Sequence, residues 1–525
     1  MGNFMTKVLV SLLDSSIPAV RRRANRLIIN KLANAVRPRP RPISMAGDGG
    51  RYTTWRGLTD RTISGRQLPP TAPEYTKSLP PLDDIMALFQ RPSGKTKLAS
   101  RTTLLLPMFA QWFTDGFLRT KWKPPTEQDY VENESTHQID LNQIYGATEV
   151  QTNILRAKKG GKLRSQMIKG EEYPEYLFDT ETLQIKPEFE GLYSDVNFTR
   201  VFQNVSDEQK KVTFAVGLEH GNSTVANTIM NTLFLREHNR LAGIIEAAHK
   251  DWDDERIFQT TRNCLIVILM KIVINDYVAH IADAPVFLDA GGFAEDQPWY
   301  RENWMSVEFN LLYRWHDMIP DQVSFTSADQ VSFSSEDEYW DMESSKTLVN
   351  NNTLMLELGV EQILLDASKQ RAGQLGLFNT PDFLLHVHKE TMKQCRMINL
   401  APYVDYCKEY GLTVPKTFRE LTGGNLEYAK ALESVYDSVE HVEWFVGLWA
   451  GGKALGQFSS DLLILMVGHD AVTQLFTNPL LSRRVYNAET FSQEGLQIIE
   501  STERLADLVV RNTNVADSLQ IRFGV

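Results

Sequence analysis

Cysteine is scarce in this sequence, which has only Cys264, Cys395 and Cys407 among 525 residues. Three cysteines, an odd and small number, give no disulfide framework of the kind typical of secreted domains. We therefore expect the protein to be located in the reducing cytoplasm. Long apolar runs are also lacking. No 18 consecutive residues are apolar, and the longest run, Leu265–Ile274, contains Lys271 and is typical of a core helix rather than a membrane span.

A positive net charge is the third absence. The formal net charge is −11 at pH 7, which excludes general binding to nucleic acid. What is present, 42% apolar and 23% charged residues, is the composition of a globular protein. The length allows one large core or two to three ordinary domains.

The first 42 residues have a character of their own. Apolar residues recur at helical spacing in residues 1–36, which predicts one or two short amphipathic helices with arginines between them. Residues 37–42 alternate arginine with proline and predict an extended linker. Such basic helices suit the surface of an anionic membrane, but a packed arm with a solvated basic face explains the pattern equally well. We divide the chain into this arm, 1–42, and a domain at 43–525, whose first part, to residue 100, is loop-rich.

The stretch Phe309–Pro320 combines a phenol with an imidazole. Tyr313 precedes His316 by three residues, with Trp315 between them, and residues three apart share one face of a helix. A neutral imidazole can ligate haem iron, and a nearby phenol can hold a radical. Taken alone, however, the stretch is more simply explained as a buried aromatic run.

The rest of the chain changes that interpretation. Phe309–Pro320 resembles the proximal-haem segment of the cyclooxygenases, within the animal haem peroxidase superfamily. Four other stretches resemble the same family in the same order: residues 109–120 (FAQWFTDGFLRT), 139–146 (IDLNQIYG), 235–241 (LREHNRL) and 258–278 (FQTTRNCLIVILMKIVINDYV). The resemblance implies a mainly α fold with one large helical catalytic domain. It also implies haem b, with His316 as the proximal ligand of the iron and Tyr313 as the radical site.

The resemblance further implies a channel for a fatty acid. Arg37 would pair with the substrate carboxylate, and Tyr277 would hydrogen-bond to Tyr313. The walls of the channel would be formed by Val278, Phe309, Trp315, Gly468 and Val472. Position 472 carries the aspirin-acetylated serine in cyclooxygenases, so valine there predicts a different position of oxygen addition.

On the distal side of the haem the sequence departs from the family. Gln111 is retained, but Asp115 replaces the distal histidine that serves as acid–base, a role typically worth a factor of about 10²–10⁴. We hypothesise that His220 faces Asp115 above the haem; a loop histidine in solvent is the alternative. Gly116 replaces an aspartate of the calcium-binding relatives, so we expect no calcium site.

These observations favour a haem-dependent fatty-acid dioxygenase. A Tyr313 radical would abstract a hydrogen from an unsaturated fatty acid such as linoleate, and O₂ would add to give a hydroperoxide. One alternative is a haem peroxidase or peroxygenase that uses Asp115, with His220, as distal acid–base. Another is a haem- and lipid-binding sensor without turnover. Relatives dimerise, so the resemblance also suggests a homodimer, and the arm suggests peripheral membrane contact.

Overall fold

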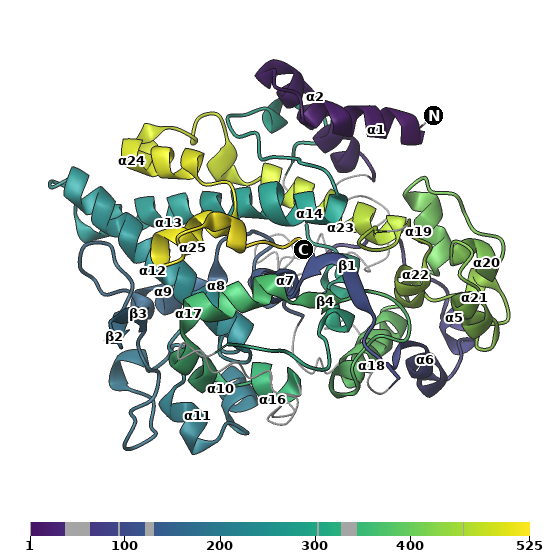
Figure 1. The fold of residues 1–525 in the computed structure, drawn as a ribbon, viewed down its shortest axis with the longest axis horizontal. Coiled ribbons are helices and arrows are strands. Elements are labelled where there is room, and N and C mark those ends of the chain that lie inside the picture. Colours follow the sequence, from purple (N-terminus) through teal and green to yellow (C-terminus); the bar gives the residue numbers. More distant parts are fainter. Residues whose placement is uncertain are drawn as a thin grey trace.

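Helices make up most of the structure. The computed structural model describes residues 2–36, 64–92, 95–120, 131–301, 304–326, 344–454 and 456–525, so Arg37 lies outside the described residues. Within them, strands form only two short antiparallel pairs, β1 (Leu98–Thr103) with β4 (Arg371–Gly373) and β2 (Ser165–Ile168) with β3 (Glu171–Pro174). The predicted mainly α fold is confirmed (Figure 1).

The centre of the molecule is α12 (Val225–Ala248), which packs against α7 (Leu105–Asp115), α13 (Asp254–Ile272), α17 (Asn352–Lys369) and α25 (Leu505–Asn512). Side chains on almost every face of its first four turns are buried, as expected of a helix surrounded by others. It begins at Thr224, whose hydroxyl accepts a hydrogen bond from the backbone N–H of Asn227 at 3.2 Å.

The helix after α12 changes its winding part-way along. It begins as α13, continues as the π-helical segment η4 (Val273–Val278) and ends as α14 (Ala279–Ala282). By length and composition, Asp254–Ala282 could cross a membrane, but most of its apolar window is buried inside the protein, as in a core helix. A π-helical turn carries an extra residue and commonly occurs at functional sites. Here it contains Tyr277 and Val278.

Helix α7 is shorter than the sequence suggests. Its amphipathic pattern predicts a helix through Thr120, but the helix ends at Asp115. The carbonyl oxygen of Gly116 instead accepts hydrogen bonds from Ser135 Oγ (2.7 Å) and Asn142 Nδ2 (3.0 Å). One helical hydrogen bond still follows, from the Leu118 N–H to the Thr114 carbonyl oxygen at 2.9 Å, but the Gly116 carbonyl is taken by these side chains and the helix does not continue to Thr120.

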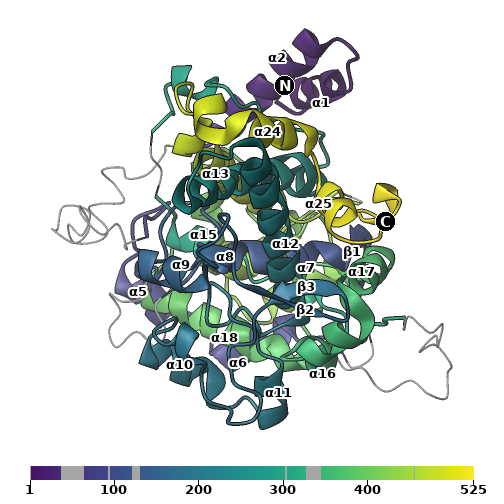
Figure 2. The same cartoon turned by 90° about the vertical axis from the view of Figure 1, so that its left-hand side faces the viewer.

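The N-terminal arm forms α1 (Gly2–Leu13) and α2 (Pro18–Ala33), which lie at one edge of the molecule (Figures 1 and 2). The two helices agree with the predicted pair. Helix α2 packs on α23 (Asp461–Phe476), where Leu32 fits against Gly468 and its carbonyl oxygen lies 3.1 Å from His469 Nδ1. The arm is therefore attached to the domain through α23.

The remaining elements surround this core. In the predicted loop-rich region before residue 100, the described residues contain two helices, α5 (Pro73–Lys77) and α6 (Leu82–Phe89), which corrects that expectation. The other helices are α5 (Pro73–Lys77), α6 (Leu82–Phe89), α8 (Asn142–Tyr145), α9 (Glu149–Leu155), η3 (Pro187–Phe189), α10 (Asp195–Phe202), α11 (Asp207–Lys211), η5 (Ala294–Asp296), α15 (Val307–Leu312), η6 (His316–Met318), α16 (Ser344–Leu348), α18 (Asp382–Met397), α19 (Tyr403–Glu409), α20 (Phe418–Leu421), α21 (Leu426–Glu433), η7 (Val439–His441), α22 (Trp444–Ala450), η8 (Pro479–Leu481), α24 (Ala488–Ser501) and η9 (Ser518–Gln520).

Candidate functional site

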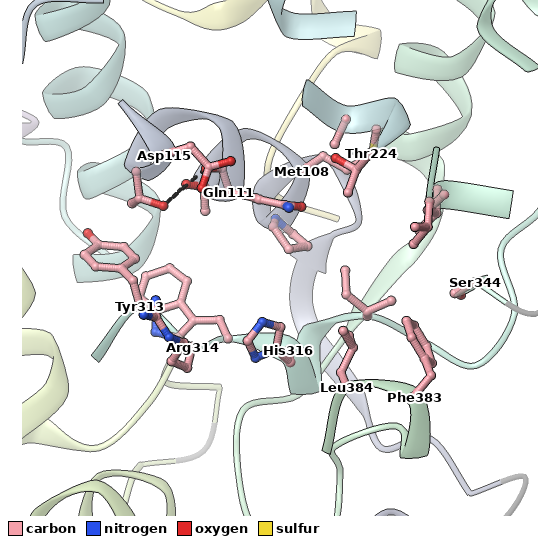
Figure 3. A pocket seen from close by; sticks show the side chains of 18 of the residues that line it. Met108, Gln111, Asp115, Thr224, Tyr313, Arg314, His316, Ser344, Phe383 and Leu384 are labelled. Carbon is pink, nitrogen blue, oxygen red and sulfur yellow. Dashed lines mark hydrogen bonds between the residues drawn. The ribbon is translucent and has the colours of Figure 1, made fainter. Parts of the chain in front are cut away.

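A cavity of about 220 Å³ separates α7 from the segment that contains Tyr313 and His316. Gln111 and Asp115 form one wall, and Tyr313, Arg314 and His316 form the opposite wall (Figure 3). The full lining consists of Pro107, Met108, Ala110, Gln111, Thr114, Asp115, Leu118, Thr224, Ala226, Tyr313, Arg314, Trp315, His316, Ile319, Ser344, Leu348, Val349, Phe383 and Leu384. The cavity thus brings together the aromatic stretch and the retained part of the distal motif.

Tyr313 and His316 do not share one helix, contrary to the sequence expectation. Helix α15 ends at Leu312, Tyr313 has ψ 48°, and His316 starts the separate 3₁₀ turn η6. Both side chains nevertheless line the cavity because the chain bends between them. The three-residue spacing correctly predicted that the two side chains lie close together, but the helix on which that prediction depended is not formed.

His316 is poised as a neutral ligand. Burial, with the neighbouring His388 and Arg314 adding to it, holds the pKa of His316 well below its ordinary value. In the described part of the chain its Nδ1 is buried without a hydrogen-bond partner. A neutral imidazole facing a cavity is the form that binds iron.

The backbone around His316 is held from behind. His388 donates through Nε2 to the carbonyl oxygen of Arg314 at 3.0 Å. The carboxylate of Asp317 accepts hydrogen bonds from the Trp449 indole, the Thr380 hydroxyl and the backbone N–H of Gly376, the last at 3.2 Å. These contacts fix the segment from which His316 projects.

Tyr313 lies in an aromatic environment. Its ring is 4.6 Å from that of Trp315 and 5.2 Å from that of Phe309, measured between centroids. Tyr277, from η4, stacks on Trp315 at 6.3 Å. Burial raises the pKa of both tyrosines above the ordinary value, so each phenol is protonated.

The two phenols are near neighbours, but the hydrogen bond predicted between them is not formed. Each hydroxyl is close enough to affect the pKa of the other. The Tyr277 oxygen is nonetheless buried without a partner at hydrogen-bonding geometry among the described residues. Tyr277 is packed against Trp315, whose ring also contacts that of Tyr313.

Asp115 and His220 are brought together, as hypothesised. His220 Nε2 lies 3.5 Å from Asp115 Oδ2, and Asn227 Nδ2 donates to the same oxygen at 3.0 Å. His220 comes from the loop before α12, over a hundred residues after Asp115. It is not a loop histidine in solvent, because only 23% of its side chain is exposed.

Charges behind His220 set its protonation state. His220 Nδ1 is 3.6 Å from Glu219 Oε1, and that oxygen also accepts from Arg119 (2.6 Å) and Arg200 (2.5 Å). Burial alone would lower the pKa of His220, but Asp115 and then Glu219 raise it to about 9. Burial alone would likewise raise the pKa of Glu219, but His220 and Arg119 hold it at about 2. At neutral pH an imidazolium therefore lies between two carboxylates.

Several residues assigned to the acyl channel do not face this cavity. Val278, Phe309, Gly468 and Val472 are buried and absent from its lining, and Gly468 is covered by Leu32 of α2. Trp315 does line the cavity, with its other side against Phe458 at 5.1 Å. The channel-wall assignments therefore stay predictions.

Other lining residues were not found from the sequence. Arg314 stands inside the aromatic stretch, and its position between Tyr313 and Trp315 was the available signal. Ser344, Phe383 and Leu384 come from α16 and α18, which carry no recognisable motif. No cluster of three histidine, cysteine or acidic residues that could hold a metal ion occurs in the described ranges, and the prediction of no calcium stays a prediction.

The arrangement fits a haem. The cavity is a slot between two walls, its lining is mostly apolar, and a neutral imidazole projects from one wall. His316 would ligate the iron, with Gln111 and Asp115 on the opposite side (Figure 3).

Comparisons with known proteins agree with this geometry. Residues 107–523 match the family described as animal haem peroxidase. The chain is 30% identical over 510 residues to prostaglandin G/H synthase 1 of Rattus norvegicus, covering 95% of this chain and 78% of the relative. It is also 30% identical over 474 residues to prostaglandin G/H synthase 2 of Gallus gallus, covering 88% and 72%.

Solved structures share the fold at lower sequence identity. Fatty acid alpha-dioxygenase of Oryza sativa has a TM-score of 0.68 at 17% identity, covering 97% of this chain and 94% of that one. Peroxidase A of Dictyostelium discoideum has a TM-score of 0.66 at 18% identity, covering 86% and 93%. The family match over most of the sequence, together with the imidazole-bearing slot, shows that the chain is a cyclooxygenase-like member of the animal haem peroxidase family.

Proposed function

We propose that the protein is a haem b-dependent fatty-acid dioxygenase that uses a radical on Tyr313. The observation that supports it most is the placement of Tyr313 and His316 on one wall of a single cavity, with Tyr277 and Trp315 packed around the phenol. The substrates would be an unsaturated fatty acid, such as linoleate, and O₂. The prostaglandin synthases and the fatty acid alpha-dioxygenase among the similar proteins support this class of chemistry.

The haem, when bound, supplies the oxidising power that removes a hydrogen atom from the Tyr313 phenol. The Tyr313 radical takes a hydrogen atom from an allylic carbon of the substrate, which restores the phenol. O₂ adds to the carbon radical, and the resulting peroxyl radical recovers a hydrogen atom from Tyr313. The net reaction joins one fatty acid and one O₂ into one hydroperoxide.

The surroundings of Tyr313 suit this task. Because burial keeps its pKa above the ordinary value, the phenol retains the hydrogen atom that it must give up. The rings of Phe309 and Trp315 exclude water from its faces. The reacting carbon must be held close to the phenol oxygen, since misplacement costs rate steeply. We assign that positioning to Trp315 and Phe309, with Val278, Gly468 and Val472 further along the acyl chain.

A second candidate function is peroxidase turnover with Asp115 as distal acid–base. The contact between Asp115 and His220 favours it, because the imidazolium would stabilise the carboxylate facing the cavity. Asp115 would take a proton from a bound hydroperoxide and return it to the departing oxygen. The two functions are compatible, since hydroperoxide turnover can start the radical chemistry.

Oxygen uptake tests the main proposal. Uptake with linoleate and with arachidonate would be measured for the wild type, Tyr313→Phe and the control Tyr300→Phe, which removes a hydroxyl outside the cavity. Uptake that is lost only in Tyr313→Phe supports the dioxygenase. Hydroperoxide consumption that persists while uptake is lost adds the peroxidase function. Uptake unchanged in Tyr313→Phe refutes the radical role, and a haem-loaded wild type without either activity indicates a sensor.

We further propose that the arm contacts membranes from a cytoplasmic location. Val8, Leu12, Ile17 and Leu27 are large apolar side chains that are between 38% and 58% exposed on α1, α2 and the turn between them. Arginines 21–23 are exposed on the same helix pair. An exposed apolar surface edged with positive charge suits anionic lipid.

A further inference from the structure

Two charged side chains line the cavity, Asp115 and Arg314, and they differ in how their charges are balanced. Asp115 already has His220 at 3.5 Å and Asn227 at 3.0 Å. For Arg314, the described residues offer neither an ion-pair partner within 4.0 Å nor a hydrogen bond to the guanidinium. The cavity therefore contains one positive charge without a counter-charge.

This charge cannot be removed by losing a proton. A guanidinium remains protonated in proteins. Arg314 is half-buried, and a partly desolvated charge normally has a partner. Because Arg314 lines the cavity, a molecule inside the cavity can supply this partner.

Asp115 does not serve as that counter-charge. It lies on the opposite wall of the cavity, at the end of α7 (Figure 3), beyond ion-pair distance of Arg314. Its own charge is balanced from behind by the imidazolium of His220.

We propose that Arg314 binds a carboxylate at the Tyr313 end of the cavity. A guanidinium matches a carboxylate through two parallel hydrogen bonds, and the otherwise mostly apolar lining suits a ligand with a single anionic end. This inference rests on the proposed function, which supplies two ligands with a carboxylate. They are the haem, through its propionates, and the fatty acid, through its acid end.

Haem titrations distinguish the first source. Apo-protein would be titrated with haem and with haem dimethyl ester, whose propionates are uncharged, and the Soret absorbance followed. Arg314→Met should weaken haem binding by about 10- to 100-fold and leave the ester unaffected, which assigns Arg314 to a propionate. Arg484→Met, at an exposed arginine outside the cavity, is the matched control.

Lipid titrations distinguish the second source. Haem-loaded protein would be titrated calorimetrically under nitrogen with oleate and with oleyl alcohol. If Arg314 holds the substrate, Arg314→Met weakens oleate binding by a similar factor and leaves oleyl alcohol unchanged. Melting temperature and far-UV circular dichroism check the fold. If Arg314→Met does not fold, Arg314→Lys keeps the charge but loses the paired geometry and should show the same selectivity with a smaller effect.

The results separate this inference from the proposed function. A wild type that binds neither haem nor oleate refutes both. A wild type that binds them, with Arg314→Met and Arg484→Met indistinguishable for all four probes, overturns only the role of Arg314.

Discussion

Replacing Asp115 by asparagine should change the titration of His220 more than any other single substitution. In the wild type the Asp115 carboxylate is the first of the groups that raise the pKa of His220 to about 9 against the effect of burial. The Asp115→Asn substitution would remove that charge and keep the size of the side chain. The His220 pKa should then fall toward its ordinary value of 6.5, because burial continues to lower it and only Glu219 continues to raise it.

The same shift has a consequence for stability. The folded pKa is about 9 and the ordinary value is 6.5, a difference of about 2.5 units, or about 3 kcal/mol at about 1.4 kcal/mol per unit. Since the folded pKa is the higher one, this stabilisation is fully present below about pH 6.5 and is lost as the pH rises through about 9. Between these pH values the free energy of unfolding of the wild type should therefore fall by up to about 3 kcal/mol more than that of Asp115→Asn.

Two measurements check this. Nuclear magnetic resonance of ¹³Cε1-labelled histidine, with His220→Gln for assignment, gives the pKa in the apo-protein. Urea unfolding between pH 6 and 10 gives the free energy difference between wild type and Asp115→Asn, with the exposed Asp437→Asn as control. A wild-type His220 that titrates near 6.5, or equal pH slopes in all three proteins, would refute the ion pair.

Three further predictions concern the haem, the packing behind it and the arm. His316→Ala should abolish the Soret band on haem titration while the melting curve of the apo-protein persists; an intact band would place the ligand elsewhere. Gly373→Ala should destabilise the fold by about 1–3 kcal/mol, because a Cβ there would overlap the carbonyl oxygen of Asp317, whereas Gly243→Ala in α12 meets no atom and should stabilise by about 0.5–1 kcal/mol in urea unfolding. Leu27→Asp should reduce co-sedimentation with vesicles of anionic phospholipid without changing haem binding. If the wild type and Leu27→Asp co-sediment equally, α2 does not contact the membrane and serves only as a packed arm.

Local pattern predicted what depends on nearby residues. The two helices of the arm follow from apolar spacing, and Tyr313 and His316 line one cavity because they are close in the sequence, although they do not share one helix. The end of α7 could not be predicted in this way. It depends on Ser135 and Asn142, which reach Gly116 from a later part of the chain. Tertiary contacts therefore override helical pattern at the boundary that matters most for Asp115.

The charged partners of the site residues could be predicted only in part from the sequence. The pairing of Asp115 with His220 was hypothesised from the family resemblance, but Glu219, Arg119 and Arg200 were not part of that hypothesis. Their association depends on how loops far apart in the chain meet. The isolation of Arg314 is equally invisible in sequence, because it is a statement about which partners do not approach it in the described structure.

The π-helical turn in η4 has a consequence for how this helix can vary. One extra residue rotates everything beyond it by about 100° relative to an uninterrupted α-helix. The side chains before Val273 and those after Val278 therefore point in directions that one regular helix would not give. Tyr277 lies in the π-helical turn between these two segments. Deleting a single residue within the turn would restore regular α-helical winding and rotate the Tyr277 phenol away from Trp315. Which side chain lies next to Trp315 therefore depends on the number of residues in this turn as much as on their chemistry.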